Sequence, residues 1–208
     1  MNSFETDCVR AFGSLNFWMG MLLECLILCK AGPKSDLFAI SVPIVVSLPY
    51  STAWIADMES GYLKEYVPRC GKKAYIFGKI AACCLSGGAL LVAAGGVYGR
   101  VCRDKAVALD LSLLFFSGML WSLCAATLAA ASKSRYVAYG GAFVLFYLLV
   151  ILKERYFVDF YCIDPVEWLM PEHTWVFDHG GILLLCGGLI ILLAMIYYEI
   201  LWRCIERV

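Results

Sequence analysis

The chain has few charged residues. Asp, Glu, Lys and Arg make up 16% of its 208 residues, and 62% of the residues are hydrophobic; an ordinary soluble domain has about 25% charged residues. A soluble fold of this size cannot hide that much apolar surface, because much of any folded surface faces water. The 17 basic and 17 acidic residues balance, so net charge indicates no nucleic-acid partner. The composition predicts a membrane protein rather than a soluble enzyme, a disordered chain or a nucleic-acid binder.

Motifs of common catalytic, cofactor and metal sites are also missing. The sequence contains no H-E-x-x-H and no phosphate-binding G-x-x-x-x-G-K-[ST]. Its two histidines, His173 and His179, are six residues apart, which is not the usual spacing of a helical metal pair. Most of the 11 cysteines lie in apolar runs and are interpreted as small hydrophobic residues; Cys25 and Cys29 have no further ligands nearby in sequence. We therefore predict no catalytic residue, no cofactor and no metal.

Long apolar segments are the main feature of the sequence. Windows of about 20 mostly apolar residues predict six membrane spans. They do not alternate as barrel strands would, so the spans are helices and the fold class is all-α. Residues 2–13 lack a basic start and a cleavage site and predict an interfacial helix, not a signal peptide. We treat 1–208 as a single domain, with spans at about 14–30, 37–56, 75–98, 106–131, 136–152 and 181–202.

The placement of basic residues predicts the orientation. Six spans put both termini on one side, and cytoplasmic loops are enriched in Lys and Arg. That side would hold Arg10, Lys64, Arg69, Lys72, Lys73, Lys79, Lys133, Arg135, Arg203 and Arg207; the other side would hold Lys30, Lys34, Arg100, Arg103, Lys105, Lys153 and Arg155. This excess predicts that both termini are cytoplasmic.

Two connecting segments are longer than simple loops. The cytoplasmic stretch 57–74 predicts a short surface helix, Asp57 to Tyr66, ended by Pro68, with Tyr62 and Tyr66 on one face; a solvated loop is the alternative. The exterior stretch 153–180 is rich in aromatic residues and contains two prolines. It predicts two short interfacial or re-entrant helices, or else an ordinary aromatic loop at the membrane surface.

Ionisable and small residues within the spans suggest two further features. Glu24 lies in the first span, where a buried charge is costly; it could face a polar pathway or pair with a basic residue. Small residues such as Gly87, Gly88 and Ala125 predict close packing of the third and fourth spans. Pro43 and Pro49 predict a kink in the second span.

The stretch 49–79 also resembles a known family. The residues that carry the resemblance are Pro49-Tyr50, Asp57, Glu59-Ser60-Gly61-Tyr62, Arg69, Tyr75-Ile76 and Lys79. They resemble the ABC type-2 exporter permeases of bacteria, in which an acidic residue and a Gly-Tyr pair lead into a coupling helix. In that family an Arg, a Tyr and a Lys follow near the start of the third span. The six-span plan, the interfacial helix and the aromatic exterior segment agree with this resemblance.

The resemblance implies a permease subunit in a bacterial plasma membrane. Such permeases form dimers with an identical or homologous permease, and each binds a separate cytoplasmic ATPase through the coupling helix. The resemblance assigns ATPase coupling to Asp57, Glu59, Gly61, Tyr62, Arg69, Tyr75 and Lys79. Small members are similar to permeases of peptide-antibiotic export and immunity systems, which suggests a peptide antibiotic or another amphipathic compound as substrate.

Two other classes of function fit the composition. A non-transporting accessory or sensor protein would share it but would not need a coupling-helix motif. A membrane-embedded enzyme would need a convergent polar constellation, and the spans contain no histidine and no paired aspartates. A partner ATPase would favour the transport subunit.

Overall fold

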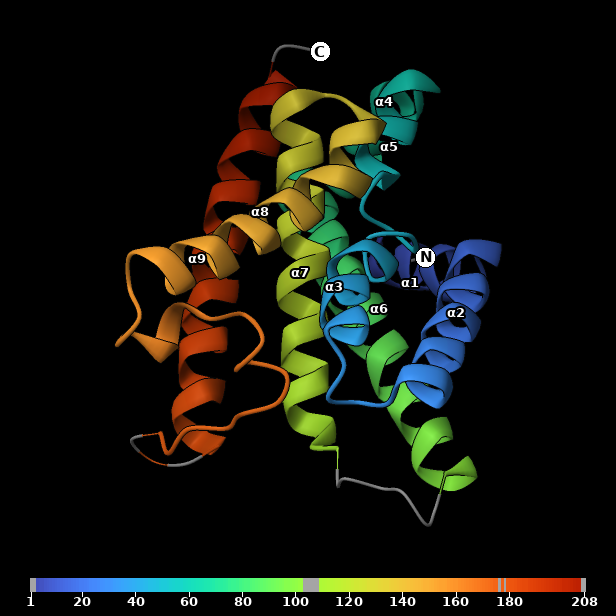
Figure 1. Cartoon of the computed structure of the whole chain (residues 1–208). Coiled ribbons are helices and arrows are strands. Elements are labelled where there is room, and N and C mark those ends of the chain that lie inside the picture. Colours follow the sequence, from blue (N-terminus) through green and yellow to red (C-terminus); the bar gives the residue numbers. More distant parts are fainter. Residues whose placement is uncertain (1–2, 103–108, 176, 178, 207–208) are drawn as a thin grey trace.

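The computed structural model describes residues 3–102, 109–175, 177 and 179–206, and in this part of the chain it is helical without strands (Figure 1). This confirms the all-α prediction. The predicted start of the fourth span at residue 106, and Arg103, Lys105 and Arg207, lie outside the described residues. The helices are α1 (Ser3–Phe12), α2 (Leu15–Ala31), α3 (Asp36–Val45), α4 (Ala53–Glu59), α5 (Tyr62–Cys70), α6 (Lys72–Val101), α7 (Leu111–Ser132), α8 (Arg135–Arg155) and α9 (His179–Glu206), with one 3-10 turn, η1 (Tyr161–Ile163).

Among the described residues, four helices, α6 to α9, are long and apolar enough to cross a membrane. A fifth crossing is possible if α1 and α2, which meet at a bend of 50°, count as one broken span. The predicted second span, 37–56, does not form one helix: α3 ends at Val45, and turns occupy 46–52 before α4. Pro43 and Pro49 each remove a backbone donor, and the Ser47 hydroxyl donates to the Ile44 carbonyl at 2.7 Å, so local bonds replace the helical ladder.

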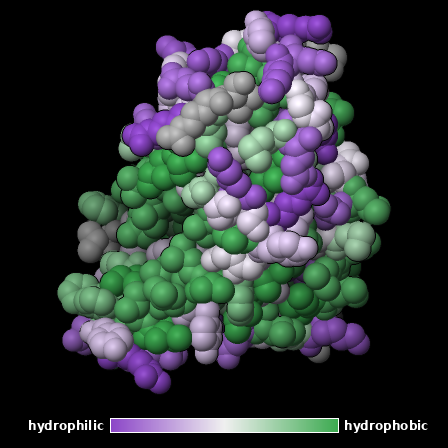
Figure 2. All heavy atoms as spheres, turned by 90° about the horizontal axis from the view of Figure 1, so that it is seen from above, coloured by the Kyte–Doolittle hydropathy of each residue, from purple (hydrophilic) through white to green (hydrophobic). Residues whose placement is uncertain are grey.

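The loops gather at two ends of the bundle. The α4–α5 corner, the α7–α8 connection and the end of α9 lie at the top in Figure 1, while the α2–α3 loop and the ends of α6 and α8 lie lower. Seen from above, hydrophilic side chains gather over the upper and central parts of the view, and broad hydrophobic areas fill its lower part and left side (Figure 2). This distribution suits a bundle whose sides face lipid.

The tightest helix pair is α6 with α7. A Cβ atom on Gly87 would lie 2.6 Å from the Gly118 carbonyl oxygen, and the Ser122 hydroxyl donates to the Cys83 carbonyl at 2.9 Å. Small residues allow this close approach between backbones. The prediction of close packing between these two segments is confirmed.

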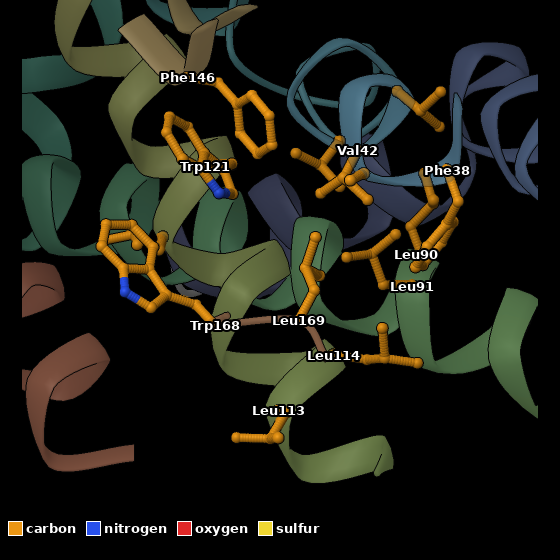
Figure 3. Packing of buried hydrophobic residues seen from close by; sticks show 14 of the residues in the cluster. Phe38, Val42, Leu90, Leu91, Leu113, Leu114, Trp121, Phe146, Trp168 and Leu169 are labelled. Atoms are coloured by element: carbon orange, nitrogen blue, oxygen red, sulfur yellow. The ribbon is translucent and has the colours of Figure 1, made fainter. Parts of the chain in front are cut away.

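The loop between α8 and α9, which the sequence predicts to be exterior, differs from the predicted re-entrant helices. Its described part, 156–175 and 177, contains only the 3-10 turn η1 and other turns. Pro165 and Pro171 each lack a donor, which leaves little room for a helix between them. The loop nevertheless folds inward: Trp168 and Leu169 are 5% and 2% exposed and pack with Trp121 of α7 and Phe146 of α8 (Figure 3).

Candidate functional site

The α4–α5 corner forms around a glycine. Gly61 has a φ of 73°, a left-handed conformation that glycine adopts without steric cost, and it separates α4 from α5. The predicted single helix from Asp57 to Tyr66 is therefore two helices. Pro68 does not end α5 as predicted; the helix continues to Cys70 and stops at Gly71, whose φ is 84°. Leu63 and Val67 face inward, while Lys64 and Arg69 are exposed.

A buried lysine lies directly behind this corner. The Lys79 side chain of α6 is fully buried, and its Nζ lies 2.6 Å from Asp57 Oδ2 of α4 and 3.0 Å from Asp7 Oδ1 of α1. The Lys79 ammonium also donates to the Tyr50 hydroxyl at 2.8 Å. Since a buried charge is costly unless it is paired and hydrogen-bonded, these partners explain how Lys79 is tolerated there.

Asp57 is the second centre of the same network. Its Oδ2 accepts a hydrogen bond from the Tyr75 hydroxyl at 2.8 Å, and its Oδ1 accepts one from the Arg10 guanidinium at 3.0 Å. Burial alone would raise the pKa of Asp57, but Lys79, Tyr75 and Arg10 together hold that pKa below its usual range. Asp57 is therefore an anion near neutral pH and links α1, α4 and α6.

The network has no net formal charge, but not all of its carboxylate oxygens accept hydrogen bonds from the described residues. Its formal charges balance, because the two carboxylates of Asp7 and Asp57 face one guanidinium, Arg10, and one ammonium, Lys79. Asp7 Oδ1 interacts with Lys79 and accepts a hydrogen bond from the Tyr50 hydroxyl. Its other oxygen, Oδ2, is buried and makes no hydrogen bond within the described part of the chain. The Arg10 guanidinium lies 4.0 Å from Asp7 Oδ1, at the limit of an ion pair.

Aromatic rings connect the surface of α5 to this network. Tyr62 and Tyr66 stack with centroids 4.7 Å apart, as their spacing of four residues predicts. The Tyr66 ring meets the Tyr75 ring edge-on at 6.3 Å, and the Arg10 guanidinium lies over Tyr62 at 5.9 Å. Tyr62 and Tyr66 of α5 are therefore in contact with Arg10 and Tyr75, the two groups that donate hydrogen bonds to Asp57.

The structure brings together some of the predicted site residues but not all of them. Asp57, Tyr75 and Lys79 are in direct contact, and Tyr62 joins them through Arg10. Glu59 lies at the exposed edge, paired with Arg135 of α8. Gly61 supplies the turn, and Arg69 is exposed near the end of α5.

Glu24 is separate from this cluster. It is fully buried in α2, where its Oε1 accepts a hydrogen bond from the Ser41 hydroxyl of α3 at 3.0 Å. The partner of Glu24 is thus a hydroxyl group and not a basic residue, which was one of the predicted alternatives. Its two contacts with Ser41 join α2 to α3.

Sequence reasoning missed three members of the network. Asp7 and Arg10 lie one turn apart in the N-terminal helix, a spacing that places both on one face. Tyr50 belongs to the Pro49-Tyr50 pair that contributes to the family resemblance, but that resemblance alone gives it no role. Only the fold brings all three to Lys79 and Asp57.

The arrangement is a network of buried ion pairs and hydrogen bonds that joins α1, α4 and α6. Among the described residues no group of three or more His, Cys, Asp or Glu side chains is placed to hold a metal ion. Comparisons with family models, curated proteins and solved structures found no match to this chain.

Proposed function

We propose that this chain is the transmembrane permease subunit of an ABC exporter, driven by a separate cytoplasmic ATPase. The α4–α5 corner would dock on the ATPase, and the resemblance suggests a peptide antibiotic or another amphipathic compound as substrate. The observation that carries the proposal is the direct bonding of this corner to a membrane helix. A surface segment that must transmit force needs such a rigid connection.

The helices support this function by their placement. α5 exposes Lys64 and Arg69 at one end of the bundle and buries Leu63 and Val67. Behind α5, Asp57 binds Lys79 of α6, the longest apolar helix of the described chain. Closure of an ATPase against α5 would therefore push on α6 and α1 together.

The remaining details follow from this assignment. If α1 with α2 forms one broken crossing and α3 with α4 another, the chain crosses the plasma membrane six times. The basic corner and both termini would then face the bacterial cytoplasm. A second permease, identical or homologous, would complete the translocation path along lipid-facing helices.

Site-specific photo-crosslinking tests the docking surface. The chain is expressed with each candidate ATPase subunit found in its gene neighbourhood, and a photoreactive amino acid replaces Tyr62 or Arg69. We expect crosslinks to the ATPase from both positions. The matched control is Phe157, a partly exposed aromatic residue of the exterior loop, which should give none.

A functional measurement complements the crosslinks. ATP hydrolysis by the reconstituted complex should fall in the variant Tyr62→Ala, while the thermal melting of the permease stays near that of the wild type. If no ATPase associates with the chain, an accessory or sensor role replaces the transport role. If Tyr62→Ala retains full ATPase stimulation, the coupling assignment of α5 is wrong.

A further inference from the structure

A groove runs between α5 and the last turn of α9. Its volume is about 410 Å³, and its lining combines apolar side chains with two lysines. The lining residues are Leu63, Lys64, Val67, Pro68, Lys72 and Ile205. Four of these six residues are apolar and two are basic, so the groove combines apolar surface with positive charge.

The two lysines are available to a ligand. No ion pair to Lys64 or Lys72 occurs within the residues that the structure describes. The Lys72 ammonium lies over the Trp202 ring at 5.5 Å, which orients this charge toward α9. An anion in the groove would therefore meet two cations without displacing a carboxylate.

The groove lies at the level where α9 changes from apolar to polar. Met195 and Ile196 are exposed to the side of the bundle, whereas Glu199 and Arg203, one and two turns later, are exposed and paired with each other. Tyr198 stacks on Trp202 and contacts Phe77, which is 62% exposed. Aromatic residues of this kind mark the boundary between membrane and water.

We propose that this groove binds one anionic phospholipid of the surrounding leaflet. Its phosphate lies between Lys64 and Lys72, and the upper part of one acyl chain lies on Leu63, Val67 and Ile205. Charge complementarity selects an anion, the apolar surface selects an amphiphile over a free phosphate, and the aromatic boundary places the groove within reach of the bilayer. The inference needs only membrane insertion and does not rest on the proposed ATPase partner.

Native mass spectrometry of the purified full chain tests the site. The protein in detergent is titrated with dioleoylphosphatidylglycerol or with dioleoylphosphatidylcholine, and retained lipid is counted. We expect one tightly retained phosphatidylglycerol, and about a tenfold weaker binding in the double variant Lys64→Gln/Lys72→Gln. Glycerol phosphate, which has no acyl chain, should not displace the lipid.

Two further variants distinguish lipid binding in this groove from nonspecific attraction of an anionic lipid to basic residues. Lys73→Gln/Lys133→Gln removes the same charge from exposed positions at the same end and should leave retention unchanged. Ile205→Trp fills the groove while keeping both lysines, and should weaken retention as much as the double lysine variant does.

Three results would overturn the proposal. Equal retention of both lipids would show no headgroup selection, and equal weakening by Lys73→Gln/Lys133→Gln would show only diffuse attraction. If Lys64→Gln/Lys72→Gln weakens binding of an ATPase subunit but leaves lipid retention intact, these lysines serve a protein partner instead.

Discussion

Lys79 Nζ of α6 lies 2.6 Å from Asp57 Oδ2 of α4, and neither side chain exposes more than 2% of its surface. The two residues are separated by a helix corner and a glycine-bounded helix, so the ion pair is a tertiary contact. Because it joins the surface corner to a long apolar helix, it sets the geometry on which the proposed coupling depends. Breaking it should change both stability and communication between these elements.

The variant Lys79→Met should be strongly destabilised. It leaves the carboxylates of Asp7 and Asp57 buried without the ammonium that both contact. Removing one partner of a buried pair costs about 3–5 kcal/mol. Thermal unfolding in detergent, followed by circular dichroism, measures the loss.

The exposed pair of Glu59 and Arg135 provides the comparison. Glu59→Gln removes an ion pair whose two side chains are 54% and 51% exposed, and exposed pairs contribute about 0–1 kcal/mol. The Lys79→Met loss should therefore be several times larger. Equal shifts in the two variants would mean that the buried network does not hold the helices together.

Acid should weaken the corner through Asp57. The folded-state pKa of Asp57 is held below its ordinary value, so its stabilising contribution is complete above that ordinary value. The contribution is lost as pH falls through the lowered folded-state pKa. The melting temperature should fall in this acid range, and Asp57→Asn should show a shallower dependence on pH. Parallel pH curves for the wild type and Asp57→Asn would contradict the assignment of the ionised, bonded state to this residue.

Much of the fold follows from composition and periodicity. The long apolar segments of α6, α7, α8 and α9 are recognisable because each provides enough residues to cross a bilayer. The segment 37–56 is equally apolar, yet it breaks after Val45. Hydropathy measures average polarity and carries little information on how Pro43, Pro49 and nearby hydroxyls redirect the backbone.

The sequence predicts only some residues of the candidate site, because the site depends on contacts between distant parts of the chain. Asp57, Tyr75 and Lys79 are predicted only because the stretch 49–79 resembles a known family, not by any pattern of charge or hydropathy. Asp7 is 72 residues from Lys79 and looks like an ordinary surface acid, but it is 4% exposed and bound to that lysine. Pairings over such separations depend on how α1 packs against α6, which no local pattern encodes.

Replacing Gly61 by a residue with a Cβ atom should lower stability, and the cause should be the backbone conformation rather than a steric clash. Nothing lies within 4 Å of the position that its Cβ would occupy, but its φ of 73° is costly for other residues. Gly61→Ala should lower the free energy of unfolding by about 1–2 kcal/mol, and Gly61→Asn by less. Chemical denaturation in detergent measures both variants, with Gly99→Ala, in open space on α6, as the control. Equal losses for Ala and Asn at position 61 would contradict a conformational cause.

The close contact between α6 and α7 predicts that Gly→Ala substitutions at two positions of α6 affect stability differently. A Cβ at Gly87 would lie 2.4 Å from Ser122 Cβ and 2.6 Å from the Gly118 carbonyl oxygen, whereas a Cβ at Gly96 meets nothing within 4 Å. Gly87→Ala should therefore force the helices apart and cost about 1–3 kcal/mol. Gly96→Ala should be neutral or stabilise by up to about 1 kcal/mol, because alanine favours the helix. Thermal unfolding of both variants in the same detergent measures the difference, and a Gly87→Ala protein as stable as Gly96→Ala would disprove the close backbone approach of α6 and α7.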